Sequence, residues 1–113
     1  MHIQVSDAGQ GVVNVSLVGR LDTPGVDRIE VPLTAHLVPS GARAIVDLSQ
    51  VAFLGSVGIR MFITIARALG RRGGKLVLYG AQAPVAEVLQ ATSLAEIIPV
   101  HADAAGAAEA ARG

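Results

Sequence analysis

The sequence predicts a single α/β domain over residues 1–113, built on a small, mixed and mostly parallel sheet. Apolar runs typical of strands covered on both faces alternate with segments whose apolar residues recur at helical spacing. The chain also begins with two strand-like segments separated by a short polar turn. Its hydrophobic content of 51% is sufficient for one compact core.

The first two strands are expected at residues 2–6, HIQVS, and 11–18, GVVNVSLV. In the second of these, apolar and polar positions alternate with the two-residue period of a strand. The five residues between them, DAGQG, are rich in turn-forming types and predict an antiparallel hairpin.

A helix is predicted to follow the hairpin. Asp22 or Thr23 provides a helix-start signal, Pro24 suits the first turn, and the next apolar residues recur at helical spacing up to Leu37. Pro32 lies inside this segment and removes one backbone donor. We therefore expect either a kink at Pro32 or two shorter helical pieces.

A buried parallel strand and a second helix are predicted next. The run ARAIVDLS, residues 42–49, is nearly continuous in apolar character, which favours a strand reached by a helical crossover. The helix expected at residues 57–72 has two opposite stripes. Its apolar stripe is Gly58, Phe62, Ile65 and Leu69, and its polar stripe is Arg60, Thr64, Arg67 and Arg71.

The remaining elements complete the order β-β-α-β-α-β-α-β-α. They are a buried strand, KLVLYG at 75–80; a helix from 83 to 94; a short edge strand, EIIPV at 96–100; and an Ala-rich helix at 103–112.

Composition argues against several classes of function. Three aromatic residues and a balance of nine cations and nine anions offer little to a nucleic acid. There is no Cys, and His2, His36 and His101 are far apart without a nearby ligand partner, so we expect no metal, no other cofactor and no enzymatic activity. No apolar run approaches membrane-spanning length, so we expect a cytoplasmic protein without membrane insertion.

Several segments resemble the STAS domain family, and in particular its stand-alone bacterial anti-sigma factor antagonists. These segments are GRLDTPG, IVDLSQVAFLGSVGIR, RGGKLVLYGA and VLQATSLAEIIPV, which occur in the family's order. The resemblance implies helices packed mainly on one face of the sheet and a function in binding rather than catalysis. It also implies partnership with an anti-sigma factor that has serine kinase activity, and with a PP2C-type phosphatase.

Ser56 is the central candidate residue, because it matches the hydroxyl residue that the kinase phosphorylates in these antagonists. From the residues alone, a serine between a strand and a helix is also expected to cap the helix. A phosphate would be compatible with the same position, since a helix start favours negative charge. Gly55 and Gly58 are expected to leave the hydroxyl open to a kinase, within a patch that includes Val57 and Ile59.

The match departs from the family pattern at two positions of this turn. Gly55 stands where the family usually has Asp, and Val57 stands where it usually has a second hydroxyl. Further residues complete the predicted partner-binding surface around Ser56, namely Asp22, Thr23 and Arg60. Asp22 is also expected to cap the first helix.

Three functions follow from this interpretation. The first is an antagonist whose binding to an anti-sigma factor is switched by phosphorylation of Ser56. The second is a non-switching STAS adaptor subunit, for example of a lipid-transport ATPase assembly. The third is a ligand-binding or enzymatic domain that uses a pocket beside the turn.

Overall fold

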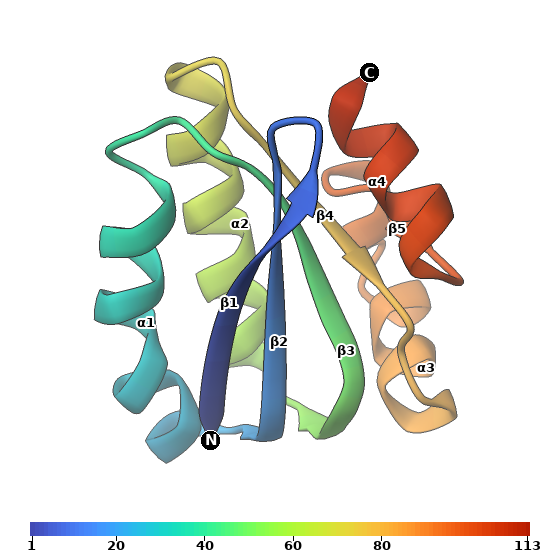
Figure 1. The fold of residues 1–113 in the computed structure, drawn as a ribbon. Coiled ribbons are helices and arrows are strands. Elements are labelled where there is room, and N and C mark those ends of the chain that lie inside the picture. The colour runs from blue at the N-terminus through green and yellow to red at the C-terminus, as the bar shows by residue number, and fades with distance from the viewer.

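The computed structural model describes all residues, 1–113, and contains one five-stranded sheet with the strand order β1-β2-β3-β4-β5 (Figure 1). β1 pairs antiparallel with β2, and every other neighbouring pair is parallel. The strands are β1 (His2–Gly9), β2 (Val12–Leu21), β3 (Arg43–Leu54), β4 (Lys75–Tyr79) and β5 (Val100–His101). The predicted element order and mixed sheet are confirmed.

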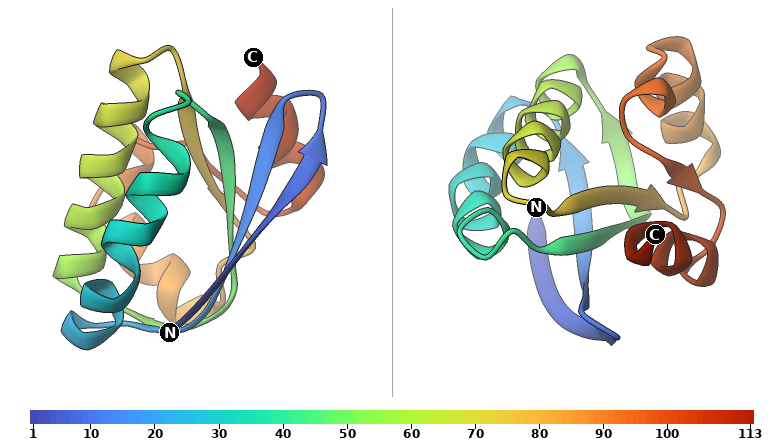
Figure 2. Two further views of the ribbon diagram at one scale, coloured as in Figure 1. Left: turned by 60° about the vertical axis from the view of Figure 1, so that its left-hand side comes forward. Right: turned by 90° about the horizontal axis from the view of Figure 1, so that it is seen from above.

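Four α-helices cover the two faces of this sheet unequally. They are α1 (Thr23–Leu37), α2 (Ser56–Arg71), α3 (Ala83–Ala91) and α4 (Ala104–Arg112). α1, α2 and α3 bury their apolar residues in one large core, whereas α4 lies on the opposite face and packs Ala107 and Ala111 in a smaller one (Figure 2). None of the helices combines the length and apolar character that a membrane-spanning segment needs.

α2 is fixed to the sheet through the apolar stripe that the sequence predicted. Phe62 is completely buried, and Ile65 and Leu69 are at most 1% exposed. Met61, which the predicted stripe omitted, is buried as well. Phe62 is therefore a central core residue, as expected.

α1 runs without interruption through Pro32, so the prediction of two shorter helical pieces is wrong. The proline is exposed, while Ile29 before it and Leu33 after it are buried in the same core. Both halves of the helix are thus held against one sheet face, and this packing keeps the segment helical despite the missing donor.

Several predicted boundaries differ from the structure, among them the ends of β2 and β3, which extend to Leu21 and Leu54. β1 continues to Gly9, so that the hairpin turn is only Gln10 and Gly11, both with positive φ. α3 ends at Ala91, and a 3-10 turn, η1 (Leu94–Glu96), occupies the start of the expected edge strand. That strand is reduced to β5, because Leu94 and Ile98 turn into the core and draw the chain off the sheet edge.

Candidate functional site

The candidate site lies at the edge of the sheet where the parallel strands β2 and β3 end and helices α1 and α2 begin. The amide of Gly55 donates to the carbonyl of Leu21 over 3.0 Å, which ties the β3–α2 turn to the end of β2. The amides of Gly58 and Ile59 donate to the carbonyl of Gly55 and start the helix. Backbone hydrogen bonds therefore join the turn to β2 and begin the helix.

Ser56 is the first residue of α2, and its side chain is exposed and makes no hydrogen bond within the protein. Gly55 occupies the N-cap position, with extended backbone angles of φ −98° and ψ 177°. A residue at the first helical position is already past the place from which a side chain caps the helix. The predicted capping role of Ser56 is therefore wrong.

Gly58 is buried, although the sequence suggested that it helps to expose the hydroxyl. A Cβ atom at this position would lie 2.8 Å from Cδ1 of Leu54 and 3.0 Å from Cβ of Leu21. Gly58 thus lets the first turn of α2 press against the ends of β2 and β3. This close packing positions Ser56 at the start of the helix. Gly58 itself has no side chain that could contact a partner.

The other predicted surface residues surround the turn. Thr23 and Arg60 are exposed, and Val57 and Ile59 are half-buried with their side chains against the large core. The two helix starts are thus brought together at one edge. The apolar residues of the turn contribute less open surface than the sequence suggested.

Asp22 caps α1, as predicted. One carboxylate oxygen accepts a hydrogen bond of 2.9 Å from the amide of Gly25, and the other lies 3.4 Å from Nε of Arg20. The Gly25 amide holds the pKa of Asp22 below its usual value, and Arg20 acts in the same direction. The negative charge of Asp22 is therefore partnered within the protein.

Arg20 and Phe53 belong to the site, but the sequence analysis did not identify them as site residues. The Arg20 guanidinium lies over the Phe53 ring, 4.5 Å from its centroid, and the ring is 39% exposed. A Cβ atom on Gly55 would lie 3.1 Å from Cε2 of Phe53. The ring edge thus lies beside Gly55, the position at which the resembling antagonists usually have Asp.

Phe53 escaped notice because β3 does not keep the two-residue period of a regular strand. Its pairing with β2 shifts twice, and each shift adds one residue to β3. Buried positions consequently recur every third residue, at Leu48, Val51 and Leu54. The two-residue spacing of Arg20 and Asp22, at the end of β2 and just after it, is the local signal that could have predicted their pairing.

Asp47 lies at the first of these shifts. Its carboxylate accepts a hydrogen bond of 2.9 Å from the amide of Ser49, two residues later. Asp47 therefore holds local backbone within β3, which continues to Leu54 instead of ending at residue 49 as the sequence predicted.

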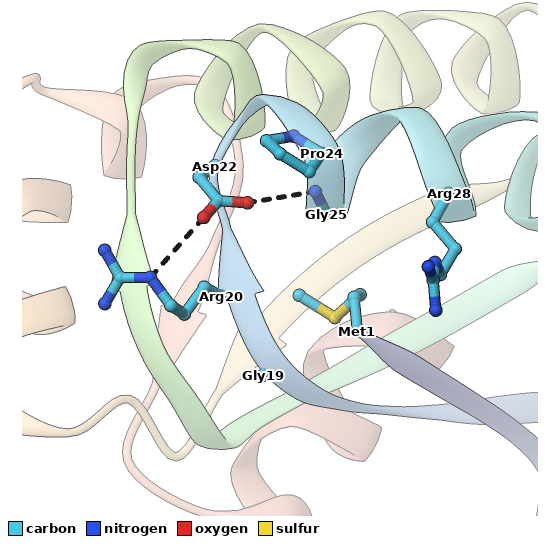
Figure 3. Close-up of a pocket in the computed structure, with 7 residues that line it drawn as sticks. All are labelled: Met1, Gly19, Arg20, Asp22, Pro24, Gly25 and Arg28. Carbon is cyan, nitrogen blue, oxygen red and sulfur yellow. Dashed lines mark hydrogen bonds and ion pairs between the residues drawn. The ribbon is translucent and has the colours of Figure 1, made fainter.

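A cavity of about 380 Å³ opens beside the start of α1 (Figure 3). Arg20 and Asp22 line one side, Met1 lies across it, and Arg28 approaches from α1. Neither Gly55 nor Ser56 contributes to its wall. The cavity is therefore separate from Ser56, and it is not the pocket beside the turn that the third predicted function requires.

The comparisons with known proteins agree with this geometry. The sequence pattern of the STAS domain family matches residues 6–107. The anti-sigma-B factor antagonist of Listeria monocytogenes is 22% identical over 100 residues, which cover 88% of this chain and 88% of that protein.

Solved structures show the same fold. A structure described as an anti-sigma factor antagonist from Mycobacterium paratuberculosis is 25% identical, with a TM-score of 0.86 over 99% of this chain and 94% of that chain. The anti-sigma factor antagonist SpoIIAA in its unphosphorylated form has a TM-score of 0.79 and 21% identity, over 99% of this chain and 97% of that chain. The phosphorylated form of Bacillus SpoIIAA has a TM-score of 0.69 and 21% identity, over 96% and 98%.

Proposed function

The chain belongs to the STAS domain family, and from this membership we propose that it is an anti-sigma factor antagonist controlled at Ser56. In this proposal the unmodified protein binds an anti-sigma factor through the surface around the β3–α2 turn. Phosphorylation of Ser56 by that partner ends the binding.

The observation that carries the proposal is the state of the Ser56 side chain. It is exposed at a helix start and makes no hydrogen bond within the protein. A serine kept for the stability of the turn would cap the helix, and here Gly55 takes that position. The hydroxyl is thus free for a reaction with a partner.

The reaction needs little from this chain beyond an accessible hydroxyl. The Oγ atom of Ser56 attacks the γ-phosphorus of ATP held by the kinase, the bond to ADP breaks, and the hydroxyl proton passes to a base of the kinase. Phosphoserine and ADP are the products. The phosphate adds about 1.5 to 2 negative charges to a turn that has no acidic side chain of its own.

A second candidate function is that of a non-switching STAS adaptor. Gly55 and Val57 favour it, because they replace the carboxylate and the second hydroxyl that the resembling antagonists carry in this turn. In the adaptor, the same surface meets its partner permanently and Ser56 is only a contact residue.

The deciding experiment combines a kinase assay with two substitutions. The protein is incubated with ATP and recombinant anti-sigma factors that carry a serine kinase domain, taken from the source genome. We expect one added phosphate, located on Ser56 by mass spectrometry and lost in Ser56→Ala. Partner binding should persist in Ser56→Ala and weaken at least tenfold, by about 1.4 kcal/mol or more, in Ser56→Asp.

Ser40→Asp is the matched control for added charge. Ser40 is also exposed but follows the C-terminal end of α1, whereas the site lies where α1 and α2 begin, so this variant should bind as the parent does. If no kinase modifies Ser56 and Ser56→Asp also binds like the parent, the switch is refuted and the adaptor function is favoured.

A further inference from the structure

The exposed face of α2 carries one continuous row of polar side chains that begins at Ser56. Ser56, Arg60, Thr64, Arg67 and Arg71 are all exposed. At 100° per residue they fall within an arc of about 80° on the helix, and they span about 22 Å along its axis. The site serine is therefore the first member of a row that runs the full length of the helix.

The positive charge of this row has no partner in the protein. α2 contains no acidic residue, and the only salt bridge in the structure joins Arg20 to Asp22. Three other cations, in contrast, donate to backbone carbonyls: Arg43, Arg72 and Lys75. The three arginines of the exposed row make no such contact. They are Arg60, Arg67 and Arg71, and we call them the arginine row.

We propose that the arginine row is a docking surface for an acidic segment of a partner protein and that it continues the surface around Ser56. This inference rests on the proposed function for the identity of the partner, but the charge of the row is independent of it. An arginine presents a planar fork of donors that pairs well with carboxylates. Three of them along one helix face favour a partner with acidic side chains at matching intervals.

Other polyanions fit this surface less well. A nucleic acid would meet as many carboxylates as cations over the whole molecule, and no exposed aromatic residue lies on α2 for stacking. A membrane surface needs an apolar anchor, and the exposed large apolar residues are on other elements: Val18, Val31, Phe53 and Ile97. Outside the arginine row the molecule carries six Lys or Arg residues against nine Asp or Glu residues, so a broad polyanion would meet net negative charge there. A discrete acidic protein segment matches the narrow row itself.

The row also explains how one phosphate at Ser56 changes binding. Arg60 follows Ser56 by four residues, so the two side chains are neighbours on the helix surface. A phosphate would offset the charge of the first arginine and would repel the acidic partner directly. Phosphorylation thus places negative charge at the Ser56 end of the arginine row, where the acidic segment of the partner would contact the turn.

The first test uses deca-glutamate as the acidic probe, with the whole protein observed by amide NMR at low salt. We expect shifts along α2 that disappear at about 0.5 M salt. The double variant Arg60→Gln/Arg67→Gln should bind the peptide about tenfold more weakly. Arg112→Gln, at an exposed arginine on the opposite sheet face, is the control and should bind like the parent.

A second arm separates protein from other polyanions. A 20-base-pair DNA duplex and vesicles containing phosphatidylserine are titrated in the same way. If either binds the arginine row more tightly than the peptide does, the acidic-protein assignment is overturned. Unchanged spectra of α2 with the peptide would overturn it as well.

Binding to the anti-sigma factor found in the kinase assay distinguishes this inference from the proposed function. Arg67→Glu should slow association about tenfold and weaken its dependence on salt, whereas Arg112→Glu should not. If the anti-sigma factor binds and Arg67→Glu has no effect, the docking inference fails and the antagonist function stands. If deca-glutamate binds the row but no anti-sigma factor does, the antagonist function fails instead.

Discussion

At the β3–α2 turn, some residues maintain the structure and another is available for binding. Gly55 takes the cap position, Gly58 allows close packing beneath the helix start, and Ser56 between them has no structural partner. The edge of the Phe53 ring fills the space beside Gly55. The turn is thus shaped by two glycines and one aromatic ring, and this arrangement leaves the serine hydroxyl exposed.

Gly58→Ala tests the close approach beneath the turn. The added Cβ would overpack the contact with Leu54 and Leu21, which costs about 1 to 3 kcal/mol and outweighs the gain in helix propensity. We expect a net loss of about 1 kcal/mol or more in the free energy of unfolding, measured with urea. Gly70→Ala in the same helix is the control. Nothing lies within 4 Å of its Cβ position, so it should stabilise by up to about 1 kcal/mol.

Asp22 predicts a specific dependence of stability on pH. The Gly25 amide lowers the pKa of Asp22 in the folded protein below its ordinary value of 3.8, so the ionised carboxylate stabilises the fold at pH values above that ordinary pKa. This contribution is lost as the pH falls through the lowered pKa. The stability advantage of the parent over Asp22→Asn should therefore be full near pH 6 and shrink below about pH 4. An advantage that stays constant between pH 6 and pH 2 in urea unfolding would contradict this assignment.

At the scale of elements, the sequence predicted the features that depend on hydrophobic periodicity and on helix capping. The apolar stripe of α2 and the Asp22 cap of α1 were foreseen, because each depends on residues close together in the chain. The exposure of Phe53 was not foreseen, since it depends on register shifts between β3 and β2. The role of Ser56 was also misjudged, because one residue of displacement at a helix start changes a cap into a free side chain.

Pro32→Ala tests why α1 remains one helix. If packing on both sides of the proline holds the helix together, restoring an amide donor should stabilise the protein by about 1 to 3 kcal/mol. Val31→Ala is the neighbouring control. Val31 is 75% exposed, so this change should be worth only about 0.5 kcal/mol. A loss of stability in Pro32→Ala would mean that the local backbone depends on the proline.

At the scale of the whole molecule, the two sheet faces are covered differently, and only one of them carries the helices that form the candidate site. α1 and α2 bring their starts together at the candidate site and share the large core with α3. α4 covers the other face with small alanine side chains, and two cations from the sheet fasten its last turn (Figure 2). Arg43 donates to the carbonyls of Ala111 and Arg112, and Lys75 donates to that of Ala110. α4 is therefore held both by the packing of its alanines and by hydrogen bonds to its C-terminal carbonyls.

Lys75→Gln should consequently loosen α4 without disturbing the site. The shorter, neutral side chain gives up a charge-assisted hydrogen bond of 2.8 Å to Ala110, and a cation is favourable at a helix C-terminus. We expect the amides of α4 to exchange with deuterium about three- to tenfold faster, which corresponds to a local loss of about 0.6 to 1.4 kcal/mol. The amides of α2, which belong to the other core, should keep the exchange rates of the parent.

Thr64→Ala, at an exposed position without a contact to α4, is the control and should leave α4 unchanged. If α2 and α4 accelerate together in Lys75→Gln, the faces open as one cooperative unit, and the Ser56 surface depends on the helix behind the sheet.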